Sequence, residues 1–127
     1  MTKSETGRMV AYGVAGWFVA AMIIRGLGPH MFNQALLHLA MLVIAAVIAW
    51  PTVRIAEMML DDQQSAGMLA PIAVFTATAT VIDGIALSFA PWIYGDIGLH
   101  TGFAGGTILF GVGALLIVGM IADSRRA

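Results

Sequence analysis

The sequence predicts an all-α membrane protein, a compact bundle of four transmembrane helices that forms a single domain over residues 1–127. Three observations lead to this prediction. Hydrophobic residues make up 60% of the chain and charged residues only 10%, which is too little charge to cover a water-soluble globule. The apolar residues fall into four long runs, each close to the length that crosses a bilayer. Glycine, proline and charged residues gather between these runs.

The four helices are expected at about residues 9–26, 33–60, 68–90 and 101–122. After the first run, the stretch RGLGPHMFNQ holds two glycines and a proline, which should end that helix. The second helix contains Pro51, but apolar residues continue at helical spacing beyond it, so we expect a kink there rather than an end. Pro91 should close the third helix, and Trp92 and Tyr94 after it are typical of the lipid headgroup level.

The basic residues predict how the bundle is oriented. Five of the six Lys and Arg residues lie near the chain ends or near the connection between the second and third helices. Four spans place these three segments on one side of the membrane, and basic residues concentrate on the cytoplasmic side. We therefore expect both termini to be cytoplasmic and the chain to lie in an inner (cytoplasmic) membrane.

Composition also argues against several kinds of function. A net charge of −1 disfavours nucleic acid as a partner, and the lack of cysteine excludes disulfides and thiolate metal sites. The three histidines show no ligand spacing, so no metal site is predicted. No phosphate-binding glycine loop or catalytic triad can be assembled, and we do not expect an enzyme.

Small residues predict where the helices touch. Lipid is as apolar as leucine, so membrane helices associate through close packing of small side chains and through polar contacts. The glycines expected at helix contacts are Gly13, Gly16, Gly84, Gly102 and Gly106. The last two have the GxxxG spacing. This pattern fits packing within one bundle and also fits packing against another chain.

Asp83 is the most informative residue of the sequence, because a charge near the bilayer centre costs about 2.5–3.5 kcal/mol. Thr76, Thr80 and Asp83 are spaced four and three residues apart, so they lie on one helix face and form a candidate intramembrane polar site. The threonine hydroxyls can bond back to their own helix or across to a neighbour. Asp83 needs a partner or a proton, and it should face protein rather than lipid.

Three roles for Asp83 remain open from the sequence. It can be a structural hydrogen-bond centre that contacts Trp17, Tyr12 or His38. It can carry a proton or a cation in a transport cycle. It can also contact a partner subunit, a bound lipid or a cofactor.

His38 is the candidate cofactor ligand, because it lies about one turn inside the second helix. Imidazole is a common axial ligand, so a haem or chlorophyll site is conceivable. The competing interpretation is a buried, hydrogen-bonded histidine, and apart from this candidate no cofactor is predicted.

The segment TVIDGIALSFAPWIYG carries a family resemblance, mainly over residues 81–95. Together with a first helix that ends near Arg25 and a proline before an R..E turn in the second helix, it resembles a family of small bacterial four-helix integral membrane proteins of unknown function. The resemblance implies the fold and a bacterial source, and it marks Asp83 and the APWIYG turn. It implies no activity.

Length and helix count are also similar to those of the small multidrug-resistance transporters. Those proteins carry a membrane-embedded glutamate in the first helix, and the first helix expected here, at about residues 9–26, has none, so Asp83 would have to take over its role. The leading hypothesis is therefore a non-enzymatic accessory or structural subunit of a larger membrane complex or of a homo-oligomer, with membrane lipids, other membrane subunits or further copies as partners. The alternatives are a small proton-coupled transporter that uses Asp83 and a haem- or pigment-binding subunit that uses His38.

Overall fold

The computed structural model describes residues 1–60, 67–95 and 101–126. Within them the elements are α1 (Lys3–Met31), α2 (Ala35–Met59), α3 (Leu69–Phe89), the 3-10 helix η1 (Pro91–Tyr94) and α4 (Thr101–Arg126). Each of the four α-helices is long and apolar enough to cross a membrane. The predicted fold class, an all-helical bundle of four membrane-spanning segments, is confirmed.

The helix α1 is longer than predicted at both ends. It begins at Lys3 rather than near residue 9, because Thr2 and Glu5 form a capping box. The backbone N–H of Thr2 donates to Glu5 Oε2 at 2.7 Å, and the N–H of Glu5 donates to Thr2 Oγ1 at 3.1 Å. These two bonds satisfy backbone groups at the helix start and extend α1 by more than a turn.

The expectation that glycine and proline end α1 near residue 26 is wrong. The helix continues through Pro29 to Met31, and the N–H of Phe32 still donates to the carbonyl of Gly28 at 2.9 Å. In a lipid environment the backbone must satisfy its own polar groups, so a helix tolerates glycine and proline where a soluble segment would form a turn. At the other end of the chain, α4 likewise runs past residue 122 to Arg126.

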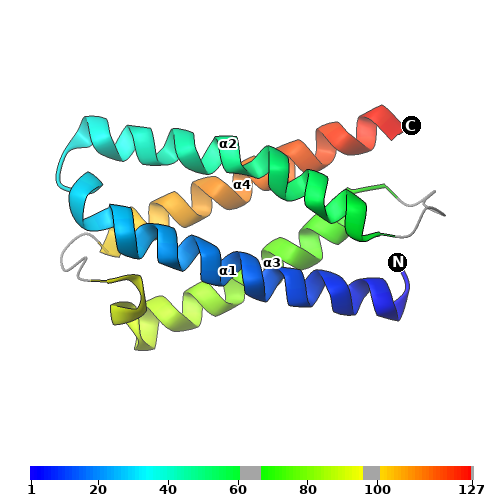
Figure 1. Cartoon of the computed structure of the whole chain (residues 1–127), viewed down its shortest axis with the longest axis horizontal. Coiled ribbons are helices and arrows are strands. Elements are labelled where there is room, and N and C mark those ends of the chain that lie inside the picture. The colour runs from blue at the N-terminus through cyan, green and yellow to red at the C-terminus, as the bar shows by residue number, and fades with distance from the viewer. Residues whose placement is uncertain (61–66, 96–100, 127) are drawn as a thin grey trace.

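The helices α2 and α3 match their predicted ranges closely, and Pro51 lies inside α2 as expected. The axis of α2 changes direction in its second half (Figure 1). A proline cannot donate its backbone nitrogen, which loosens the helix at that point. Next to it, the carbonyl of Thr52 accepts a hydrogen bond from Tyr12 of α1 at 3.1 Å, so the bend is tied to a neighbouring helix.

Helix pairing does not follow chain order. The helix α1 packs mainly along α3, α2 packs mainly along α4, and α3 also packs against α4 (Figure 1). The consecutive helices α1 and α2 touch much less. Both chain ends lie at the same end of the bundle (Figure 1).

Two clusters of buried residues fill the interior, one toward each end. The cluster near η1 is Ala21, Ile24, Phe32, Met41, Ala86, Tyr94 and Ala104. The cluster near the termini is Met9, Val53, Ala56, Met68, Ile72 and Ala122. Many large apolar side chains, among them Leu36, Met58 and Phe89, remain exposed on the outside of the bundle. That surface suits contact with lipid rather than water.

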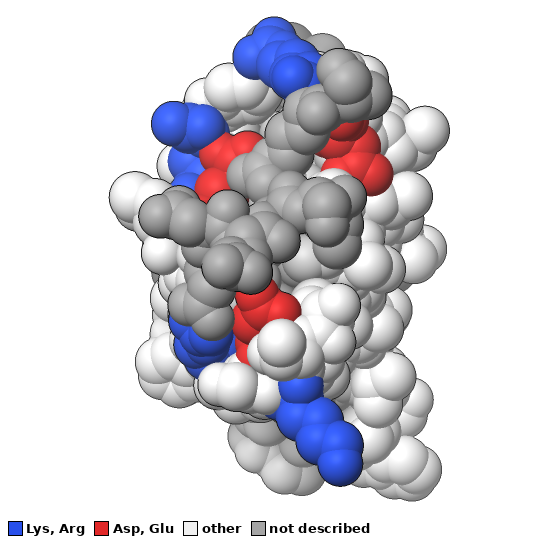
Figure 2. Space-filling view, turned by 90° about the vertical axis from the view of Figure 1, so that its right-hand side faces the viewer, with Lys and Arg blue, Asp and Glu red and all other residues white. Residues whose placement is uncertain are grey.

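Charged side chains collect where the chain begins and ends. Figure 2 looks at this end of the bundle and shows Lys, Arg, Asp and Glu side chains gathered on it. The described charged residues that belong to the nearby helix ends include Lys3, Glu5, Arg8, Arg54, Glu57, Asp123 and Arg125. At the opposite end of the bundle, Arg25 is the Lys or Arg residue that the structure describes. Among the described residues, the charged side chains are therefore concentrated at the end of the bundle that holds the two termini.

Asp123 of α4 caps the start of α3, which has no side-chain cap of its own. Its Oδ1 accepts hydrogen bonds from the backbone N–H groups of Met68 and Leu69, the latter at 3.1 Å. We expect Asp123→Ala to lower the free energy of unfolding by about 1 kcal/mol, the usual loss for an N-cap. Denaturation in mixed detergent micelles, followed by circular dichroism, measures this change. Asp123→Asn keeps an accepting oxygen and should lose much less; equal losses for both variants would contradict the capping role.

Candidate functional site: the Asp83 cluster and the helix faces

Asp83 faces the interior of the bundle, as the sequence predicted. It lies in the second half of α3, and only 5% of the residue is exposed. Its Oδ1 accepts a hydrogen bond from the phenol of Tyr94, and that phenol oxygen in turn accepts a bond from Trp17 Nε1 at 3.1 Å. The three side chains come from α3, η1 and α1. These three side chains, Asp83, Tyr94 and Trp17, form a chain of hydrogen bonds that joins the three elements, and we call them the Asp83 cluster.

Tyr94 is the partner of Asp83 that sequence reasoning missed. It is completely buried among the helices, whereas Trp92 beside it is largely exposed. Burial raises the pKa of the Tyr94 phenol, and the hydrogen bond to the Asp83 carboxylate raises it further. The phenol therefore stays protonated and acts as a donor. Of the predicted partners of Asp83, Trp17 belongs to the cluster, through Tyr94, while Tyr12 and His38 bond elsewhere.

The short helix η1 brings Tyr94 back toward α3. Pro91 begins η1 immediately after α3 ends, and Gly95 closes it with a φ of +89°, which suits glycine. Arg25 of α1 holds this turn, because its Nη1 donates to the carbonyls of Trp92 at 3.0 Å and Ile93 at 3.2 Å. Arg25 is thus the second residue that the sequence analysis missed. The proline after an apolar run and the glycine four residues later are the signal for a chain reversal.

The two threonines do not join Asp83. Thr76 Oγ1 donates to the carbonyls of Ile72 at 2.8 Å and Ala73 at 3.1 Å, within its own helix. Seven residues separate Thr76 from Asp83, which is about 10 Å along a helix and too far for its short side chain. The hydroxyl of Thr80 is buried and has no hydrogen-bond partner within the described part of the chain. Thr76 and Asp83 both face the interior, and the hydroxyl of Thr76 bonds back to its own helix as one of the expected alternatives, while the intramembrane polar site as a whole stays a prediction.

The predicted packing glycines divide into two groups. A Cβ added to Gly13 would lie 2.8 Å from the carbonyl oxygen of Phe75, and one added to Gly16 would lie 2.5 Å from the Phe75 ring. These two glycines let α1 and α3 approach closely. Gly84, Gly102 and Gly106 have no heavy atom within 4 Å of such a Cβ, so for them the interpretation as packing residues within the chain is wrong.

His38 lies between two aromatic rings at the η1 end of the bundle. Its ring centroid is 5.6 Å from that of Phe32 and 4.7 Å from that of Phe103, and its Nε2 is 3.5 Å from Thr107 Oγ1. This arrangement fits the interpretation of a packed, polar-contacted imidazole. A cofactor role for His38 stays a prediction. Among the described residues, no group of three or more acidic or histidine side chains could hold a metal ion.

Comparison of the chain with protein-family models, curated proteins and solved structures gives no match. The resemblance to the bacterial four-helix family therefore stays a prediction. The fold and the Asp83 cluster are the findings on which a function has to be argued.

Proposed function

We propose that this protein is a non-enzymatic membrane subunit that works by packing against other membrane helices, either further copies of itself or the helices of a larger complex. The outward face of α4 carries this proposal. Gly102, Gly106 and Gly113 follow one another at steps of four and seven residues, and no heavy atom lies within 4 Å of a Cβ at any of them. Such a face lets a second helix approach backbone to backbone.

The helix α3 offers a second face of the same kind. Ala73, Ala77, Gly84 and Ser88 follow at steps of four, seven and four, and all four residues are exposed. Gly13 and Gly16 of α1, in contrast, already pack against α3. Two helices thus carry faces of small residues that no other part of the described chain covers. This favours a protein that packs against other helices over one that works as a monomer.

The contacts of Asp83 also favour a structural role over a role in transport. A carboxylate that carries protons across a membrane has to exchange partners with water or substrate. Asp83 instead accepts a hydrogen bond from Tyr94, which Arg25 holds in place through η1. These contacts use Asp83 to join α1, α3 and η1, and they favour packing over transport.

We further propose that the charged end of the bundle faces the cytoplasm of a bacterial inner membrane. The basic residues near the helix ends at this side support that orientation through the positive-inside rule. The proposed partner helices would then share the bilayer with the exposed faces of α3 and α4.

Purification from the native membrane in mild detergent tests the proposed function. We expect the protein to migrate as a dimer or larger oligomer, or with another membrane protein in fixed stoichiometry, in light-scattering and mass-spectrometric measurements. Gly106→Leu should reduce this association at least tenfold, because the side chain blocks close helix approach. Gly26→Leu on α1, where space is also open, serves as the matched control and should leave association unchanged.

Two outcomes would contradict the proposal. A colourless monomer without a partner would contradict the proposed packing against other helices. A coloured preparation that His38→Ala bleaches would favour a haem- or pigment-binding subunit. The absorption spectrum of the same sample distinguishes these cases.

A further inference from the structure

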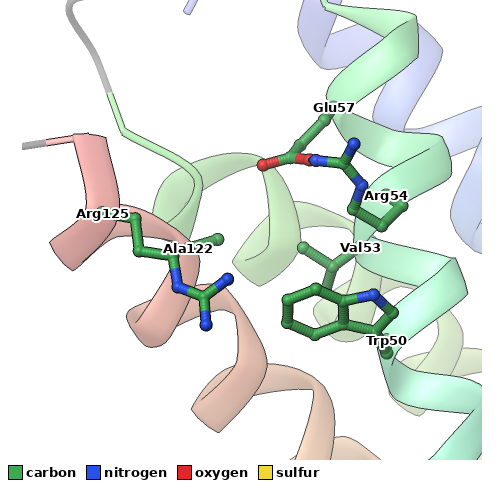
Figure 3. A pocket seen from close by; sticks show the side chains of 6 residues that line it. All are labelled: Trp50, Val53, Arg54, Glu57, Ala122 and Arg125. Carbon is green, nitrogen blue, oxygen red and sulfur yellow. The ribbon is translucent and has the colours of Figure 1, made fainter.

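A pocket of about 140 Å³ lies between α2 and α4 at the charged end of the bundle. Its lining residues are Trp50, Val53, Arg54, Glu57, Ala122 and Arg125. Figure 3 shows the Arg125 side chain of α4 facing the Trp50 ring of α2, with Arg54 and Glu57 beside them. The pocket is separate from the Asp83 cluster and from the glycine faces, so it has no part in the proposed function.

The charges of this pocket leave an excess of one positive charge. Arg54 Nη1 donates to Glu57 Oε2 at 2.5 Å, and this bond uses one nitrogen of a guanidinium that carries five N–H groups. The guanidinium of Arg125 lies over the Trp50 ring, 5.4 Å from its centroid. Among the described residues, Arg125 has no hydrogen-bond acceptor. Two guanidinium groups thus flank the pocket and face a single carboxylate.

The depth of the pocket matches the membrane surface. The helix α2 has 25 residues, which is about 37 Å, and the apolar core of a bilayer is about 30 Å thick. The last turns of α2 therefore reach the headgroup region. Trp50 lies nine residues before the end of α2, about 13–14 Å deeper along the helix axis, so its ring, which is 46% exposed, lies beside the acyl chains below the headgroups.

The chemistry of the lining is divided in a way that suits an amphipathic ligand. The guanidinium groups of Arg54 and Arg125 can hold a phosphate by charge-assisted hydrogen bonds. Val53 and Ala122 supply apolar walls, and the exposed Trp50 ring supplies an apolar surface beside them. A free inorganic anion would contact the guanidinium groups but would leave the apolar walls without a partner.

We propose that this pocket binds the phosphate headgroup of an anionic phospholipid, with Arg125 and Arg54 on the phosphate and Trp50 against the upper part of the acyl chains. Basic pockets between membrane helices are a common way to hold such headgroups. The lipid would bridge α2 and α4 at the end of the bundle where Asp123 already joins α4 to α3.

Native mass spectrometry of the purified protein in mild detergent tests the proposal. The probe is phosphatidylglycerol, titrated in parallel with phosphatidylcholine that has the same acyl chains. We expect tighter binding of phosphatidylglycerol, and a loss of roughly tenfold in Arg125→Gln, as removal of one charged contact implies. Lys3→Gln removes a positive charge at the same end outside the pocket and should change binding less than about twofold.

Three results would overturn the proposal. Equal binding of the two lipids would remove the role of the headgroup charge. Equal losses in Arg125→Gln and Lys3→Gln would mean a diffuse attraction rather than a site. Displacement of phosphatidylglycerol by millimolar inorganic phosphate would make this a site for a free anion. Circular dichroism of both variants checks that a loss of binding does not come from misfolding.

Discussion

Replacing Tyr94 with phenylalanine is expected to lower the free energy of unfolding by about 1–3 kcal/mol, although the change removes only one oxygen atom. The phenol donates to the buried carboxylate of Asp83 and accepts from Trp17. Without it, the buried Asp83 and the partly buried indole N–H of Trp17 lose this partner, and a buried polar group that has given up its water without gaining a hydrogen bond destabilises the fold. Titration with a denaturing detergent, followed by circular dichroism, measures the loss.

Tyr12→Phe is the control, because it also removes one phenol oxygen but breaks only one hydrogen bond between helices. Its hydroxyl donates to the carbonyl of Thr52 at 3.1 Å, and no charged group depends on it. We expect a loss below about 1 kcal/mol there, typical of hydrogen bonds in membrane proteins. If Tyr12→Phe and Tyr94→Phe lose equal stability, then Asp83 does not depend on Tyr94 as argued.

The second large effect is expected at Gly13, where a single methyl group should separate α1 from α3. In Gly13→Ala the new Cβ would lie 2.8 Å from the carbonyl oxygen of Phe75 and 2.9 Å from Thr78 Cβ. A backbone atom cannot turn aside as a flexible side chain can, so the helices must shift. Overpacking of this kind costs about 1–3 kcal/mol, and α1 would lose contact with its main partner.

Gly26→Ala tests the same substitution in the same helix without the close contact. Nothing lies within 4 Å of a Cβ at this position, so alanine should be neutral or should stabilise the helix by up to about 1 kcal/mol. Mixed-micelle denaturation compares the two variants directly. A loss at Gly26 as large as the loss at Gly13 would mean that the effect comes from the backbone rather than from the α1–α3 contact.

The number and placement of the helices could be predicted from the sequence, because apolar runs of bilayer length have few other structural outcomes. The errors at the ends of α1 have separate physical causes. The capping box of Thr2 and Glu5 is a T-x-x-E pattern, which is a recognisable helix start in the sequence. The continuation through Pro29 fits the rule that glycine and proline, which end helices in soluble proteins, are tolerated inside membrane helices.

The candidate site was predicted only in part. The need of Asp83 for a buried partner follows from elementary electrostatics, but the identity of that partner depends on how η1 folds back onto α1 and α3. The helical spacing of Thr76 and Asp83 predicts that they lie on the same face of α3. It does not place them at the same height along the helix, so they do not contact each other. Which glycines pack inside the bundle also depends on helix pairing, and no pattern along a single helix reveals that pairing.

The pairing of α1 with α3 has a consequence for the order in which the protein is made. The α1–α2 hairpin leaves the ribosome first, but these two helices share few contacts, so it is not a stable unit by itself. The first helix has to wait in the bilayer, with Gly13 and Gly16 uncovered, until α3 has been synthesised and inserted. During this interval the uncovered face of α1 can pack against helices of other proteins. The native packing of α1 therefore forms only after α3 has been inserted.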